Sequence, residues 1–248
     1  MFPIINIGPL AIQAPELLLV IGIYFSILLA EKTATSFDEN PNQISNLVFI
    51  YFVSTIILGR IAYILRFSAL FIEKPLSIIS IDKNLFDFNS GLILSIIVAV
   101  IYIQKKKLVL FKVMDALAIP LLSFLLFFFL AQYASGNLYG KPSDLRWSIY
   151  LWGMQRHPLP IYYMIGVATI LVWAFRFFKN KYSPGVFFTI TLASLSILTV
   201  FLDYFNGNPQ NLFQGINILQ VIAWVVLFFC LYIIYDKIGK TKPQNFSG

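Results

Sequence analysis

The sequence is poor in the residues that build metal and redox sites. It has one cysteine, Cys230, and one histidine, His157, among 248 residues. A lone cysteine excludes an internal disulfide, a thiol pair and a cysteine-based metal site. With a lone histidine as well, the usual zinc and haem ligand sets cannot form. A phosphate-binding P-loop, a dinucleotide fingerprint and repeats of roughly 20–50 residues are also missing, so we expect no metal and no cofactor.

Charged residues are scarce too, and hydrophobic residues are abundant. Only 12% of the chain is charged, against about 25% in soluble domains, while 59% is hydrophobic and the mean hydropathy is +0.81. This composition excludes an ordinary soluble domain. A helix that crosses the roughly 30 Å hydrocarbon core needs about 20 apolar residues. Seven apolar runs therefore predict an all-α polytopic membrane protein with about seven transmembrane helices.

The candidate spans are the runs at residues 15–30, 44–65, 91–103, 116–134, 161–178, 185–202 and 216–235. The first carries Glu16, and the third is short. Residues 1–15 lack a charged start and no A-x-A cleavage site follows, so we expect the first span to be retained. We predict one membrane domain, residues 1–239, and a polar tail, residues 240–248, that is disordered.

The basic residues predict the orientation of the spans. Three alternating segments carry Lys105, Lys106, Lys107 and Lys112, then Arg176, Lys179 and Lys181, then Lys237, Lys240 and Lys242. Cytoplasmic loops are rich in lysine and arginine, so we expect these segments inside and the N-terminus and polar segment 136–158 outside. We attribute the net charge of +7 to this topology and to attraction for anionic lipid, and we expect no nucleic-acid partner. The first loop, with Glu31, Lys32, Asp38 and Glu39, gives the scheme no support.

Polar side chains are costly in a bilayer, so those within or beside the spans are candidates for function. Seven of them fall at the outer ends of the spans: Arg60, Asn89, Gln132, Asn137, Arg156, His157 and Asp203. We expect them to converge on one polar cavity that opens to the outer leaflet. Such a cavity would suit the headgroup of an anionic lipid.

Each of these residues also has a structural alternative. Arg60 can snorkel to the headgroups, and Asn89 is placed to be the N-cap of the third span. The two amides at the end of the fourth span can bond neighbouring helices. Asp203 can be a solvated carboxylate beside a turn, and His157 can bond a loop carbonyl.

The polar segment 136–158, GNLYGKPSDLRWSIYLWGMQRHP, with Tyr162 after it, resembles the signature region of bacterial prolipoprotein diacylglyceryl transferases. That family reads N-G-E-L-Y-G-R-P-T-D-L-P-W-G, followed by R-H-P-S-Q-L-Y-E. Residues 8–12 (GPLAI), 73–78 (EKPLSI) and 88–93 (FNSGLI) resemble its G-P-L-A-I, N-P-L-E-I and H-G-G-L-I motifs. Asp115 fits as well. The resemblance covers essentially the whole chain, with the motifs in order.

The resemblance implies a transferase of the bacterial plasma membrane. Members of the family move the diacylglyceryl group of phosphatidylglycerol to the thiol of a lipobox cysteine and release glycerol phosphate. The implied partners are therefore phosphatidylglycerol and either a prolipoprotein signal peptide or another membrane protein. Cations must hold the phosphodiester, and a base must help to form the thiolate. From the family's polar set this chain keeps Arg60, Tyr63, Gly140, Arg156, His157, Tyr162 and, conservatively, Asp203.

Other reactive positions of the family are replaced in this chain. By resemblance, Asn89 replaces the motif histidine, Asn137 a glutamate and Gln132 an asparagine. Phe129 and Thr199 replace two arginines. We assign the catalytic positions to Asn89, Asn137, His157 and Asp203. We assign headgroup binding to Arg60, Tyr63, Gln132, Gly140, Arg156 and Tyr162.

Two functions of different class fit these residues. One is an active but divergent diacylglyceryl transferase in which Arg60 and Arg156 hold the phosphate and His157 supplies the base. The other is a non-catalytic membrane scaffold that binds lipid or a partner protein. The ordered motifs favour the first, whereas the loss of a base and of charge-stabilising donors favours the second. A transporter is third, because no broken helices or internal symmetry are evident.

Overall fold

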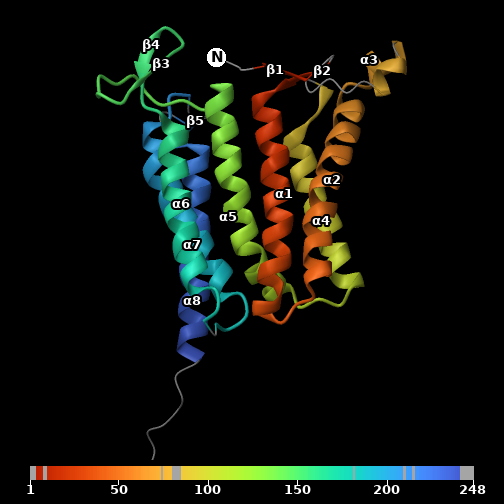
Figure 1. Cartoon of the computed structure of the whole chain (residues 1–248), viewed down its shortest axis with the longest axis vertical. Coiled ribbons are helices and arrows are strands. Elements are labelled where there is room, and N and C mark those ends of the chain that lie inside the picture. Colours follow the sequence, from red (N-terminus) through yellow and green to blue (C-terminus); the bar gives the residue numbers. More distant parts are fainter. Residues whose placement is uncertain are drawn as a thin grey trace, which may run out of the picture.

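Long helices form a bundle in the computed structural model of the chain (Figure 1). The structure describes residues 4–7, 10–73, 75–79, 85–180, 182–208, 211–213 and 216–240. Within them, seven helices are long and apolar enough to cross a membrane. These are α1 (Ala14–Ala34), α2 (Pro41–Arg66), α4 (Phe88–Lys105), α5 (Leu110–Ser135), α6 (Leu159–Phe177), α7 (Val186–Leu202) and α8 (Ile218–Lys240). The predicted all-α polytopic membrane fold is confirmed, and each helix overlaps one of the predicted spans.

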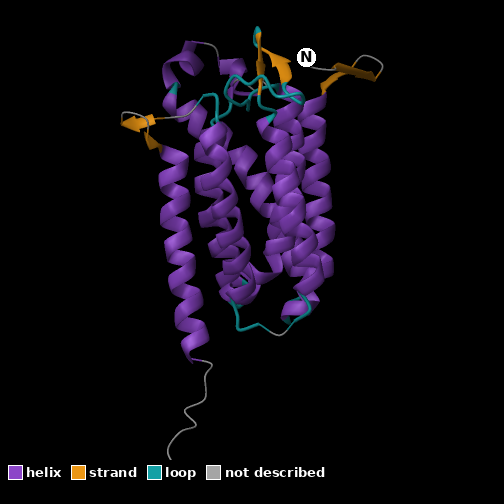
Figure 2. Ribbon diagram, turned by 90° about the vertical axis from the view of Figure 1, so that its left-hand side faces the viewer, coloured by secondary structure: helices purple, strands orange, loops and turns teal. Residues whose placement is uncertain are grey.

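Short elements gather at one end of the bundle. They are the antiparallel pairs β1 (Ile4–Ile7) with β2 (Leu10–Gln13), β3 (Ile149–Leu151) with β4 (Met154–Arg156), and β5 (Asn211–Phe213) with β6 (Ile216–Asn217), the helix α3 (Ser68–Glu73), and the 3₁₀ helices η2 (Pro75–Ile79) and η4 (Asp203–Phe205). Figure 2 shows the strands at the end opposite to the last turns of α8. The described polar segments that carry the candidate site lie at this same end.

Helices α1 and α5 pack along each other at the centre of the bundle. Pro120 lies inside α5 and has no backbone N–H, so the Ala116 carbonyl one turn earlier lacks its helical donor. The Thr33 hydroxyl of α1 lies 2.9 Å from that carbonyl oxygen, and the Ser26 hydroxyl donates to the Pro120 carbonyl at 2.9 Å. The Thr33 hydroxyl therefore lies at the carbonyl that Pro120 leaves without its helical donor, and Ser26 adds a second polar contact between α1 and α5.

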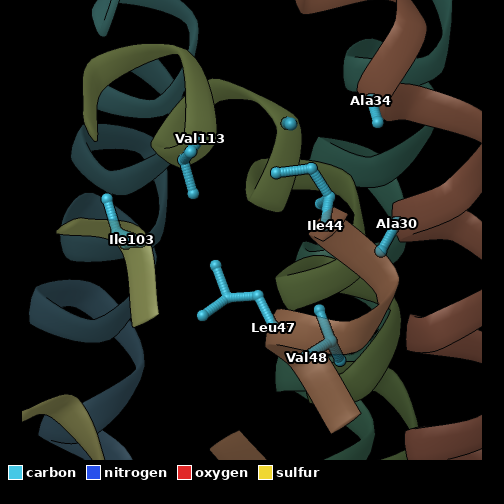
Figure 3. Packing of buried hydrophobic residues seen from close by; sticks show 8 residues of the cluster. Ala30, Ala34, Ile44, Leu47, Val48, Ile103 and Val113 are labelled. Carbon is cyan, nitrogen blue, oxygen red and sulfur yellow. The ribbon is translucent and has the colours of Figure 1, made fainter. Parts of the chain in front are cut away.

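The remaining long helices lie on opposite sides of the α1–α5 pair. Helix α2 packs on α1 and α4 packs on α2, whereas α6 and α7 pack on α5 and α8 packs on α7. Figure 3 shows the buried cluster where α1, α2, α4 and α5 meet, with Ala30, Ala34, Ile44, Leu47, Val48, Ile103 and Val113. Small alanines on α1 let α2 approach closely, as is usual where helices pack in membranes.

Two glycines bring α2 and α4 into contact near the end of the bundle that carries the strands. A Cβ atom on Gly91 would lie 2.4 Å from the Thr55 carbonyl oxygen and 3.0 Å from the Gly59 Cα. We expect Gly91→Ala to lower the free energy of unfolding by about 1–3 kcal/mol, because backbone must move to admit the methyl group. Chemical unfolding in detergent micelles measures this. Ile93→Val, at a position 66% exposed on the same helix, is the control, and equal stability of wild type and Gly91→Ala would contradict this packing.

The described residues of the three basic segments that the sequence places inside lie at the end of the bundle opposite the hairpins. The ends of α4, α6 and α8 and the start of α5 share this end (Figure 1) and carry Lys105, Arg176, Lys237 and Lys112. Lys181 and Lys242 lie outside the described residues, as do residues 241–248 of the predicted tail. The cytoplasmic placement of this end and the domain limits stay predictions.

The acidic first loop has a partner at this same end. Asp38 forms an ion pair with Lys112 at 3.1 Å, and the Glu39 carboxylate accepts from the Val109 N–H at 3.3 Å. The loop's carboxylates therefore face the neighbouring basic loop.

Candidate functional site

The polar segment 136–158 folds back on the end of α5 through a tight hairpin. Trp152 and Gly153 form the two-residue turn between β3 and β4, with φ angles of 54° and 82°, as a type I′ turn requires. Positive φ is unusual for a residue as large as tryptophan. The Trp152 indole N–H donates to the Gly136 carbonyl at 3.2 Å, which ties the turn to the C-cap of α5.

Residues 139–143 lie between two other backbone segments and join the ends of three helices. The Gly140 N–H donates to the His157 carbonyl at 3.0 Å, and the His157 N–H donates to the Lys141 carbonyl at 3.1 Å. On the other side, the Lys141 N–H donates to the Phe205 carbonyl at 2.8 Å. The segment after α5 is thereby held against the start of α6 and the end of α7.

Gly140 is the closest backbone contact in this arrangement. A Cβ atom there would lie 2.5 Å from the His157 Cβ and 2.6 Å from its carbonyl oxygen. The Gly140 carbonyl also accepts from the Arg156 Nη1 at 3.4 Å. A glycine at this position therefore lets Arg156 and His157 share one anchor.

The Arg156 guanidinium is held on one edge. Its Nε donates to the Leu151 carbonyl at 3.2 Å, and its carbon lies 4.8 Å from the centre of the Tyr139 ring. Together with the Gly140 bond this occupies two of five N–H donors, and Nη2 has no partner among the described residues. The half-buried side chain is thus held in place, while its Nη2 hydrogens are available to a ligand.

His157 contacts two aromatic side chains. Its Nδ1 lies 3.2 Å from the Tyr162 hydroxyl, which accepts from the Trp147 indole N–H at 2.8 Å. Its ring meets the Phe205 ring edgewise, with centroids 5.1 Å apart. Trp147 belongs to the motif that the sequence matched, but sequence reasoning did not select it as a site residue.

Asp203 is buried, with 4% of its surface exposed. Its two oxygens accept from the side-chain amides of Asn206 (2.9 Å) and Asn217. The interpretation of Asp203 as a solvated carboxylate is therefore wrong. Asn206 pairs with Gly140 through a backbone bridge, so Asp203 is linked to Gly140 through Asn206. Through Asn217, Asp203 also contacts the strand before α8.

Arg60 directs its guanidinium to backbone carbonyls of the segment that follows α3. Nη1 donates to Leu85 at 2.7 Å, Nε to Ile78 at 3.3 Å, and Nη2 to Ser77 and Ile78. Phe71 and Phe86 lie over it, at 5.5 Å and 5.3 Å from the guanidinium carbon. All three of its nitrogens are occupied, so Arg60 holds the backbone at Ser77, Ile78 and Leu85.

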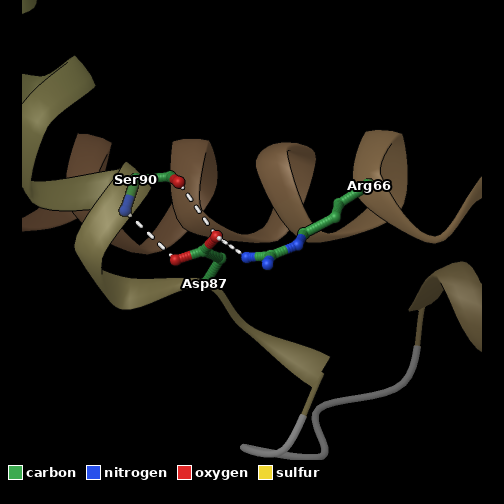
Figure 4. A network of polar contacts seen from close by, with 3 residues as sticks. All are labelled: Arg66, Asp87 and Ser90. Atoms are coloured by element: carbon green, nitrogen blue, oxygen red, sulfur yellow. Dashed lines mark hydrogen bonds and ion pairs between the residues drawn. The ribbon is translucent and has the colours of Figure 1, made fainter.

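The N-cap of helix α4 is Asp87, and the interpretation of Asn89 as the N-cap is wrong. The Asp87 carboxylate accepts from the Ser90 N–H at 3.2 Å and hydroxyl at 2.9 Å, and pairs with Arg66 at 3.4 Å (Figure 4). These Ser90 hydrogen bonds, and then the Arg66 charge, lower the pKa of the Asp87 carboxyl. An ionised aspartate is a better cap for the positive end of the helix than a neutral amide. Asn89 stays exposed beside it.

The site residues predicted from the sequence fall into two groups. Tyr63 and Asn89 line an open cleft of about 290 Å³ near Arg60, between the end of α2 and the start of α4. Gly140, Arg156, His157, Tyr162 and Asp203 meet at the ends of α5, α6 and α7. No hydrogen bond or ion pair among the described residues joins the groups, and a single shared cavity stays a prediction.

Gln132 and Asn137 lie at the edge of the second group. The Gln132 carbonyl accepts from the Gly136 N–H at 2.9 Å, as part of the helix end, and Asn137 is exposed on the turn that follows. Neither side chain has a hydrogen bond to another described residue. The structure therefore does not give either amide the role between helices that the sequence allowed.

An apolar cleft lies directly beside the second group. It has a volume of about 530 Å³ and runs between α7 and α8, lined by Ile197, Val200, Phe201, Tyr204, Phe205, Gln220, Trp224 and Leu227. Phe205 belongs to both, since it lines the cleft and packs on the His157 ring. A polar cluster and an apolar cleft of this kind match the two halves of a lipid molecule.

Comparison with known proteins gives one consistent result. Residues 3–235 match the family model described as prolipoprotein diacylglyceryl transferase. The phosphatidylglycerol–prolipoprotein diacylglyceryl transferase of Vibrio atlanticus is 27% identical over 97% of this chain and 93% of its own length. The proteins of that name from Photobacterium profundum and Bordetella parapertussis are 28% and 30% identical, covering 84% and 68% of this chain and 81% and 68% of their own lengths. This multi-pass membrane protein therefore belongs to the prolipoprotein diacylglyceryl transferase family.

Proposed function

We propose that this protein binds the headgroup of phosphatidylglycerol at the outer face of the bacterial plasma membrane, around Arg156 and His157. In this proposal the transfer of diacylglyceryl to a lipobox cysteine is lost or altered. The N-terminus is outside and the C-terminus cytoplasmic, in line with the basic end of the bundle. The macromolecular partner is a prolipoprotein signal peptide or another membrane protein.

The observation that carries the proposal is the guanidinium of Arg156. Two bonds fix it, and Nη2 has no partner among the described residues. A guanidinium fork matches a pair of phosphate oxygens. The neighbouring apolar cleft supplies room for an acyl chain beside the same cluster. Arg60, in contrast, already gives its donors to carbonyls, so we assign it to the fold of the outer segment.

The replaced positions are the reason to propose lost or altered transfer. The thiolate sulfur must bond to the glycerol carbon while the bond from that carbon to the phosphate oxygen breaks, and glycerol phosphate leaves with the electron pair. Asn89 cannot take the thiol proton, and the Thr199 hydroxyl bonds to the Leu195 carbonyl at 2.9 Å and carries no charge. Missing donors to the developing charge typically cost about 10²–10³ in rate each.

A second candidate is an active but divergent transferase. The family match over nearly the whole chain favours it. Arg156 would then hold the phosphate, and His157 would accept the thiol proton. That role requires an imidazole nitrogen with a free lone pair toward the substrate.

Arg156→Ala tests the binding site. We expect it to lower the affinity for phosphatidylglycerol by about tenfold or more, since charged hydrogen bonds are worth roughly 1.5–3 kcal/mol each. The protein is reconstituted in lipid nanodiscs that contain increasing amounts of phosphatidylglycerol. Native mass spectrometry then measures how much phosphatidylglycerol each variant retains. Arg146→Ala, an exposed arginine of the same loop, removes the same charge and is the matched control. Equal losses in both variants, or no loss in either, would refute a site at Arg156.

A further inference from the structure

The Trp147, Tyr162 and His157 side chains form a continuous hydrogen-bonded chain beside Arg156. The Trp147 Nε1 lies 2.8 Å from the Tyr162 hydroxyl, and that hydroxyl lies 3.2 Å from the His157 Nδ1. The members come from the 136–158 segment and the first turn of α6. The chain therefore spans the two sequence segments that the family signature contains.

The hydrogens in this chain can be assigned from the chemistry of its members. An indole N–H only donates, so the Tyr162 oxygen is the acceptor from Trp147. A phenol has one hydrogen of its own, and His157 Nδ1 is the only other partner of that hydroxyl among the described residues. If Tyr162 donates to Nδ1, both the indole N–H and the phenol O–H have an acceptor. If Nδ1 donated instead, the phenol hydrogen would have no acceptor among the residues that the structure describes.

We infer that Trp147 and Tyr162 are positioning residues that hold neutral His157 in the tautomer with its hydrogen on Nε2. The ring then presents an N–H donor, and not a basic lone pair, at its free edge. This inference rests on the proposed function for the nature of the ligand. An N–H donor suits a phosphodiester oxygen, whereas the active-transferase candidate needs the opposite tautomer.

Within the described part of the chain, the surroundings of His157 offer no competing partner for Nδ1. The Asp203 oxygens accept from Asn206 and Asn217, and the Lys141 ammonium lies over the Tyr204 ring, 4.3 Å from its centre. The backbone N–H and carbonyl of His157 are bonded to residues 140–141, and Phe205 packs on the ring edge. Both the position and the rotation of the imidazole are therefore restricted.

The lone histidine makes a direct test possible. Protein with ¹⁵N-labelled histidine in nanodiscs gives ring nitrogen signals from His157 alone, because the chain has one histidine. Spectra are recorded over a series of pH values, and the tautomer is read from those in which the ring carries a single hydrogen. We expect Nε2 in the protonated range and Nδ1 in the unprotonated range. The reverse assignment would overturn the inference, whatever the lipid affinity.

Variants then separate positioning from general stability. We expect Tyr162→Phe to populate both tautomers and to weaken phosphatidylglycerol binding by about 3–10-fold, the value of one neutral hydrogen bond. Trp147→Phe is expected to shift the ring signals in the same direction but less. Tyr150→Phe, at an exposed position on β3, is the control. Unchanged ring signals in Tyr162→Phe would contradict the inference.

Adding phosphatidylglycerol distinguishes this inference from the proposed function. A shift of the Nε2 signal on addition of the lipid, absent with phosphatidylcholine, supports both. The expected tautomer with no response to phosphatidylglycerol supports the positioning of His157 but overturns the headgroup site. Because the ring signals do not depend on turnover, the test applies to an inactive protein as well.

Discussion

Replacement of Asp115 by alanine is expected to lower the free energy of unfolding by about 2–5 kcal/mol. The Asp115 carboxylate projects from α5 and accepts from the Gly185 N–H at 2.6 Å and the Phe188 N–H at 2.8 Å. Only 2% of its surface is exposed. Helix α7 starts after a glycine that supplies no side-chain cap, so alanine at position 115 would leave two buried donors unsatisfied, at about 1–3 kcal/mol each.

Two further variants define the cause of this loss. Asp115→Asn keeps one acceptor oxygen but turns an N–H₂ group toward the other donor, so its stability should fall between wild type and Asp115→Ala. Asp144→Ala removes an exposed carboxylate and should change stability by less than about 0.5 kcal/mol. Unfolding by denaturant in a mixed micelle gives all three values. An Asp115→Ala protein as stable as wild type would show that α7 is capped in another way.

Gly140→Ala is expected to abolish most lipid binding while leaving the long helices folded. The new methyl carbon would lie within 2.6 Å of both the His157 Cβ and its carbonyl oxygen. The 139–143 segment must then move away, which breaks the backbone bonds to His157 and the Arg156 bond to the Gly140 carbonyl. Since two proposed binding groups lose one anchor, we expect a fall of at least about tenfold in phosphatidylglycerol affinity.

The control for Gly140→Ala is a change on the same hairpin that touches neither group. Gln155→Ala is exposed on β4 and should bind phosphatidylglycerol as wild type does. Circular dichroism checks that helix content is equal in the two variants, and retained lipid is measured by mass spectrometry. Wild-type lipid binding by Gly140→Ala would contradict the site, because Arg156 and His157 cannot keep their positions around that methyl group.

The sequence predicted the positions of the long helices but not the residues that cap them. A run of apolar residues long enough for the bilayer predicts a span whatever packs beside it, and all seven were confirmed. The start of α4 was misplaced because the capping preference of Asn89 is similar to that of Asp87. In the structure Asp87 accepts from the Ser90 N–H and also pairs with Arg66, which lies a span earlier in sequence, and capping preference alone does not reveal these contacts.

The polar site was predictable in its members and not in its arrangement. Family motifs identified Arg156, His157 and Tyr162, which the structure brings together. Sequence could not tell that Arg60 bonds to loop carbonyls 17–25 residues away, or that Asp203 meets Asn217 from the segment before α8. Those contacts depend on which helix ends are neighbours in the folded bundle. Hydropathy predicts where each span lies in the sequence but not which spans are neighbours.

Our central proposal is that the protein holds phosphatidylglycerol through Arg156 but transfers the diacylglyceryl group of this lipid slowly or not at all. The most direct measurement supplies phosphatidylglycerol and a lipobox peptide to the purified protein in nanodiscs and quantifies the thioether-linked product and the retained lipid in one sample. The account predicts retained lipid that depends on Arg156, with product formed at least about 10²-fold more slowly than by the Vibrio atlanticus relative. Product formed at a comparable rate, and lost in His157→Ala, would contradict it.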